Sequence, residues 1–144
     1  MILSRLALTA LLLSASACAS NGRPPTTEET RYETSWAHYP DVIGEDGRPR
    51  SDFDTEPEII GGMGSLERLV DAAGQGERCA VSGRVILSVL VDEAGRVAES
   101  QLARGIGGGC DEVALEASRG LQFRPATDGG EPKKSVFSFP IRFQ

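Results

Sequence analysis

Alternation of apolar residues in the second half of the chain is the strongest constraint on its fold. In the run GRVILSVLVD, every second residue on one face is aliphatic: Val85, Leu87, Val89 and Val91. This is the period of a β-strand that turns one face toward a core. Ile86 and Leu90 add apolar side chains to the other face. We therefore expect a strand whose two faces are both partly covered.

Two further strands are predicted. Asp92–Gly95 reads as a hairpin turn, with glycine where a positive φ is easiest. The return strand is then 96–104, and its imperfect alternation predicts a β-bulge. Near the C-terminus, a last strand is indicated by alternating large side chains on one face: Phe137, Phe139, Ile141 and Phe143.

Helical spacing occurs in two places. Leu66, Leu69, Val70 and Ala73 recur as on one helix face, with Ser65 as the expected N-cap and Gly74 as the expected stop. After a glycine-rich loop at 105–109, a second helix presents small residues: Ala114, Ala117, Ser118 and Leu121. The predicted order is helix, strand, strand, helix, strand. This favours an α+β fold in which two helices pack on a three-stranded antiparallel sheet.

The N-terminus has the layout of a secretory signal over residues 1–17. A basic start at Arg5 precedes a short apolar run and the small residues Ala15-Ser16-Ala17. Cys18 follows directly, as in a bacterial lipobox, which favours lipidation of its thiol. Plain cleavage at an A-x-A site is the alternative. Because Ala19 is not an aspartate, a lipid-anchored chain is expected at the outer membrane, facing the periplasm.

Residues 18–56 are predicted to be a flexible tether, and residues 57–144 a folded domain. The tether is rich in proline, threonine and glutamate, so it can bury too little surface to offset its ordering entropy. A few apolar side chains interrupt it and are expected to dock either on the domain or on a partner: Tyr32, Trp36, Tyr39, Val42 and Ile43.

Composition excludes several function classes. The formal charge of −6 and the lack of basic clusters argue against binding of nucleic acid. His38 is the single histidine and has no companion ligands, so no metal site and no cofactor are expected. No pairing of a nucleophile with a base is indicated, and we expect the chain not to be an enzyme.

Cys79 and Cys110 flank the predicted hairpin. Cys79 lies just before its first strand and Cys110 just after its second. The two ends of a hairpin are neighbours, and an exported chain meets an oxidising compartment, so a disulfide between them is predicted. A redox role is the alternative, but no C-x-x-C motif accompanies either thiol.

Four motifs in order resemble the C-terminal domain of TonB-type energy transducers. They are the hairpin segment 83–97, Phe123-Arg124-Pro125-Ala126, the ending Pro140-Ile141-Arg142-Phe143, and an upstream segment, Glu56–Met63, similar to the P-G-G-M of one branch. The resemblance spans about residues 57–143. The family's Y-P-x-x-A segment is replaced here by 76–80. A membrane helix and a long proline-rich linker, typical of TonB transducers, are not evident.

This resemblance implies a periplasmic protein-binding module acting in TonB-dependent outer-membrane transport. In the family, a receptor segment adds to an edge strand by β-augmentation. The matching strand here is Ser135, Val136, Phe137, Ser138, Phe139, Pro140, Ile141, Arg142 and Phe143. Pro140 cannot donate a ladder bond and indicates an edge, although it can equally serve to protect that edge.

Two other roles stay open. The chain could be an accessory or structural envelope lipoprotein that uses the same fold for assembly, with another envelope protein as its partner. Domains like this also sometimes dimerise through the same edge, so a homodimer is a further expectation.

Mass spectrometry of the mature N-terminus tests the predicted processing. We expect a chain that begins at Cys18 and carries the added mass of a diacylglyceryl group. An unmodified N-terminus, or an intact leader, would contradict lipidation.

Overall fold

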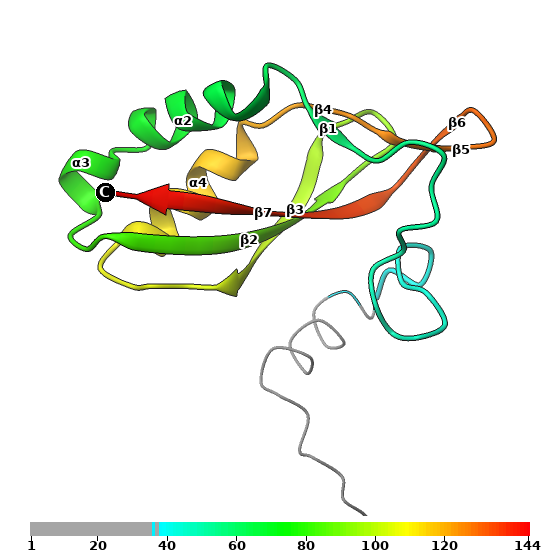
Figure 1. The fold of residues 1–144 in the computed structure, drawn as a ribbon, viewed down its shortest axis with the longest axis horizontal. Coiled ribbons are helices and arrows are strands. Elements are labelled where there is room, and N and C mark those ends of the chain that lie inside the picture. The colour runs from blue at the N-terminus through cyan, green and yellow to red at the C-terminus, as the bar shows by residue number, and fades with distance from the viewer. Residues whose placement is uncertain (1–35, 37) are drawn as a thin grey trace, which may run out of the picture.

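A three-stranded antiparallel sheet forms the centre of the domain (Figure 1). The computed structural model describes Trp36 and residues 38–144. The strand order is β3-β2-β7, with bounds Val97–Arg104, Gly83–Val91 and Ser135–Phe143. Helices α2 (Gly62–Ala72) and α4 (Cys110–Arg119) pack on each other and lie together on one side of the sheet. The predicted α+β architecture is confirmed.

Shorter elements extend this frame. Helix α3 (Gln75–Arg78) forms one turn between α2 and the sheet. Strand β1 (Glu58–Ile59) pairs with β4 (Phe123–Arg124). Strands β5 (Ala126–Asp128) and β6 (Glu131–Lys133) form a small hairpin just before β7. None of these was predicted, because elements this short show no measurable period.

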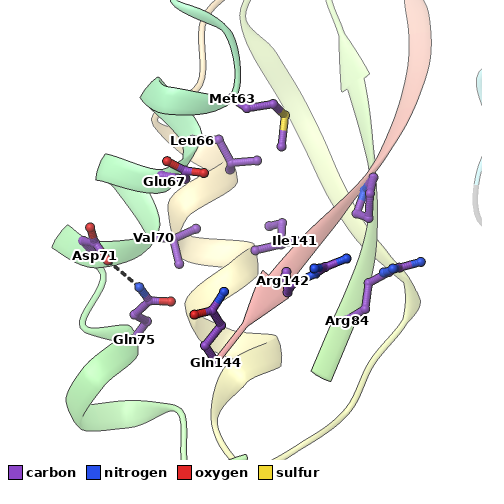
Figure 2. A pocket seen from close by; sticks show the side chains of 11 residues that line it. Met63, Leu66, Glu67, Val70, Asp71, Gln75, Arg84, Ile141, Arg142 and Gln144 are labelled. Carbon is purple, nitrogen blue, oxygen red and sulfur yellow. Dashed lines mark hydrogen bonds between the residues drawn. The ribbon is translucent and has the colours of Figure 1, made fainter. Parts of the chain in front are cut away.

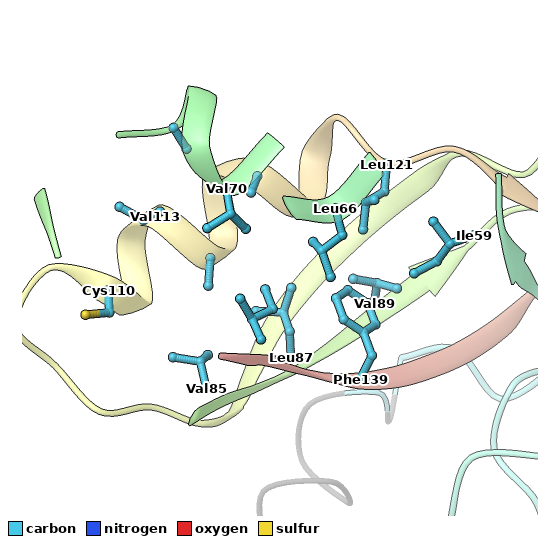
Figure 3. Close-up of a cluster of buried hydrophobic side chains, with 14 of the residues drawn as sticks. Ile59, Leu66, Val70, Val85, Leu87, Val89, Cys110, Val113, Leu121 and Phe139 are labelled. Atoms are coloured by element: carbon cyan, nitrogen blue, oxygen red, sulfur yellow. The ribbon is translucent and has the colours of Figure 1, made fainter. Parts of the chain in front are cut away.

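The main core lies between the helices and the inner face of the sheet (Figure 3). The four aliphatic residues that alternate along β2 are all fully buried, as predicted. They meet Leu66 and Val70 of α2 and Val113 of α4. Each such side chain contributes about 1.5–3 kcal/mol through burial. This face of β2 therefore holds both helices on the sheet.

A second, smaller core lies on the opposite face of the sheet. Trp36 and Val42 are completely buried there against Leu90 of β2. Tyr39, Ile43 and Val136 pack around them. In Figure 1, this segment lies on the side of the sheet away from α2. Of the two docking alternatives, the structure supports docking on the domain; Tyr32 lies outside the described residues.

The structure tests three local predictions: the bulge in the return strand, the helix stop at Gly74 and the N-cap at Ser65. The return strand is irregular, with register shifts at two points of its pairing with β2, so the predicted bulge is confirmed. Gly74 ends α2 in the left-handed region, with φ of 86°. The N-cap prediction was wrong: α2 begins at Gly62 after Gly61, and the Ser65 hydroxyl donates to the carbonyls of Ile60 and Gly62 instead.

The turn between β2 and β3 is organised by the Asp92 carboxylate. It accepts hydrogen bonds from the backbone N–H of Ala94 at 3.0 Å and of Arg96 at 2.8 Å, and from Arg96 Nε at 3.0 Å. Burial opposes ionisation, but these hydrogen bonds outweigh it and lower the pKa of Asp92 below its ordinary value of 3.8. Gly95 completes the turn with φ of 77°, where a Cβ would collide with the Phe123 carbonyl.

The lowered pKa predicts a pH-dependent contribution of Asp92 to stability. Since the folded-state pKa lies below 3.8, the ionised carboxylate stabilises the fold above that pH and loses its effect as pH falls through the folded value. We expect Asp92→Ala to lower the free energy of unfolding by about 1–2 kcal/mol at neutral pH. The deficit should shrink as the pH is lowered further below 3.8, as measured by urea unfolding.

Glu93→Ala is the matched control for this substitution. Glu93 occupies the same turn and is exposed, so its removal should change stability little at either pH. A deficit for Asp92→Ala that is independent of pH would contradict the role given to the carboxylate.

Candidate functional site, an open strand edge beside a groove

Strand β7 pairs along its whole length with β2 and with nothing else in the described part of the chain. The register runs without a shift from Gly83 opposite Phe143 to Val91 opposite Ser135. No described strand or loop pairs with its outer side. An unpaired, regular strand is a template on which another strand can form.

Pro140 shows which residues face outward. It lies opposite Ile86, and without an N–H it cannot take part in a pair that exchanges two backbone hydrogen bonds. Its backbone therefore points away from β2. Because directions alternate along a strand, the N–H and C=O groups of Val136, Ser138 and Arg142 also point outward. The close side chains of Ser88 and Ser138, with hydroxyl oxygens 2.8 Å apart, fit the same alternation.

A groove of about 610 Å³ runs between this edge and α2. Figure 2 shows Leu66 and Val70 of α2 facing Ile141 of β7 across it. Met63 stands at one end with 49% of its surface exposed, and Ile60 nearby is 52% exposed. Glu67 and Asp71 add negative charge along the helix side. The groove can therefore take apolar side chains of a strand that adds to β7.

The sheet has a second edge, on β3, which is a poorer template. Its pairing with β2 skips Ala98 and Ala103, so the strand is bulged at both ends. Bulges twist an edge away from flat pairing and disfavour the addition of another strand. Between the two edges, the regular one on β7 is the better candidate.

The predicted disulfide between Cys79 and Cys110 is present and joins the end of α3 to the start of α4. The two Cα atoms are 4.4 Å apart. Gly109 permits this approach: its φ is 83°, and a Cβ there would overlap the carbonyl of Arg78. Since Gln75 of α3 lines the groove, the crosslink also holds that end of the groove in place.

The predicted site residues do not all remain accessible. The side chains of Ser135, Phe139, Ile141 and Phe143 are buried, and Val136 packs against the Trp36 cluster, so the edge beyond Val136 offers a partner mainly backbone groups. The groove wall on α2 was missed by the sequence analysis. Its signal was Met63, a large apolar side chain outside the predicted buried face. Residues 1–17 and Cys18 lie outside the described residues.

The fold is that of a small α+β domain whose three-stranded sheet ends on one side in a regular edge strand. Residues 75–144 match the family model for the Gram-negative bacterial TonB protein C-terminal, so this part of the chain is similar to that family. The match begins after α2, so the Glu56–Met63 motif still rests on resemblance. No curated protein and no solved structure matches the chain. In the described residues, no helix is long and apolar enough to cross a membrane.

Removal of the disulfide should destabilise the domain. The crosslink closes a loop between cysteines separated by 31 positions, which corresponds to about 3–4 kcal/mol in the chain-entropy estimate. We expect Cys79→Ser/Cys110→Ser to lose stability of that order in denaturant unfolding. Reduction of the wild type by dithiothreitol should have a similar effect and leave the double variant unchanged. Two free thiols in the exported protein, detected by alkylation and mass measurement, would contradict the pairing.

Proposed function

We propose that this domain binds a segment of a TonB-dependent outer-membrane receptor, which adds to β7 as a fourth strand. Domains of this family are periplasmic and interact with outer-membrane receptors or other envelope proteins. The observation that carries the proposal is the regular nine-residue strand with an outer edge that no described residue pairs, beside a groove lined by both apolar and charged side chains. The role is one of binding, with no catalytic step.

The estimated binding free energy favours reversible binding of the receptor segment. Along the open edge, backbone hydrogen bonds contribute about 0.5–1.5 kcal/mol each, and Pro140 removes one donor. A large apolar side chain buried in the groove adds about 1.5–3 kcal/mol. Loss of translational and rotational freedom offsets at least about 4 kcal/mol. The balance corresponds to affinities of roughly micromolar or weaker. A partner held this way can be released, as a transport cycle requires.

We further propose that the chain acts as an adaptor tethered by a lipid at Cys18 to the outer membrane. The support is the lipobox-like segment that ends at this cysteine. A lipid anchor has no helix with which to reach an inner-membrane motor, so the proposal assigns receptor binding to this chain and leaves energy transduction to another.

A second proline in β7 tests strand addition. Ser138 points its N–H toward the open edge, so Ser138→Pro removes an outward donor without breaking a ladder bond to β2. We expect about a twofold to tenfold loss of affinity for synthetic peptides copied from receptor N-terminal segments. Isothermal titration calorimetry measures this directly.

Ser138→Ala is the matched control, because it removes the hydroxyl contact with Ser88 and keeps the backbone donor. Its affinity should stay close to that of the wild type. Unchanged peptide affinity in Ser138→Pro, with the fold intact by circular dichroism, would refute binding at this edge.

A further inference from the structure

Three arginines form a row across the open face of the sheet, at the end where β7 finishes. Arg142 of β7 lies directly opposite Arg84 of β2, and Arg104 of β3 lies opposite the next outward residue, Ile86. All three are exposed, and they line a shallow pocket of about 520 Å³ with Gly83, Ile106 and Phe143. Figure 2 shows Arg84 and Arg142 extending side by side, away from α2. We call these residues the arginine row.

The arginine row has no counter-ion in the described part of the chain. Four other arginines there are paired with carboxylates: Arg50 with Asp52, Arg78 with Glu116, Arg96 with Asp92, and Arg124 with Glu58. Acidic residues outnumber basic ones in this chain by 21 to 15, so a row without acids is unusual for it. Like charges directly opposite each other on neighbouring strands destabilise a sheet. The cost of this arrangement is offset if an anionic group binds there.

Negatively charged residues lie on the α2 side of the β7 edge, across from the arginine row. Glu67 and Asp71 line the groove on its α2 side, whereas Arg84 and Arg142 line it on the sheet side and extend away from α2 over the open face (Figure 2). Successive side chains of an added strand point alternately into the groove and over the open face. If the guest strand shifts by one residue, the side chains that pointed into the groove point over the open face, and the others point into the groove. The charge difference therefore selects one register for the guest.

We propose that the guest strand carries an acidic side chain over the arginine row, between two apolar side chains that enter the groove beside Met63, Leu66 and Val70. This inference rests on the strand addition proposed above and specifies its ligand as a segment with an apolar-acidic-apolar pattern. The acidic group pairs with Arg142, which belongs to the edge strand itself, and with the adjacent Arg84. The chain thus selects its partners by charge and by register.

Three synthetic peptides that differ in one residue test the pattern. Each is a short extended sequence of serine and threonine around a central valine-X-valine, with X as glutamate, glutamine or lysine. For the wild type, we expect the glutamate peptide to bind about fivefold more tightly than the glutamine peptide, and the lysine peptide more weakly than both. The preference should decline with added salt.

A charge-reversing substitution in the arginine row tests the same charge preference from the side of the protein. Arg142→Glu should invert the order, with the lysine peptide binding best. Arg119→Glu, an equal charge change at an exposed position on α4, is the control and should keep the wild-type order. Hydrogen exchange of the β7 amides reports strand addition separately from the charge preference.

The outcomes distinguish the two proposals. Equal binding of all three peptides, with β7 amides protected, would overturn the charge selection and leave strand addition standing. Absence of protection with every peptide would overturn both. Binding of the wild type to phosphatidylglycerol vesicles that is lost in Arg142→Glu, without any preference among the peptides, would assign the row to a membrane surface and so refute the inference.

Discussion

Burial of the inner face of β2 under the two helices is the interaction on which the rest of the structure depends. Four aliphatic side chains of one strand fill the space that α2 and α4 close. Because β2 is the central strand, its burial also fixes the positions of β3 and β7 on either side. A sheet of three strands necessarily has two edges. The small size of the domain thus creates the feature on which the proposed function relies.

The two edges of the sheet differ in the regularity of their strands and in the elements beside them. Strand β3 is bulged and lies beside α4, whereas β7 keeps an unbroken register and stands beside a groove. Pro140 removes a single donor from this edge, which limits uncontrolled pairing without abolishing it. The disulfide between α3 and α4 stiffens the frame around the groove. A rigid edge that is already in strand conformation lowers the ordering cost of binding a guest.

The Trp36 cluster gives the domain a layer on its second face. Trp36, Val42 and Leu90 are fully buried together, and the side chains of Lys134 and Asp41 approach to 3.6 Å beside them. This segment covers the start of β7 and leaves 137–143 open. It also leaves the arginine row uncovered, at the other end of the sheet. Residues that precede the matched region 75–144 therefore limit how much of the proposed binding edge is exposed.

The sequence by itself determined the three strands of the central sheet and the two longer helices, because apolar residues recur in each with the spacing of that element. It also indicated the edge strand through Pro140, and the crosslink through the positions of the two cysteines around the hairpin. Tertiary structure alone decided how much of the edge is open, which depends on where Trp36 packs. It also brought α2 beside β7 to form the groove, and set Arg84, Arg104 and Arg142 in one row. These residues are far apart along the chain, and no local pattern encodes a distance between strands that only the register and packing establish.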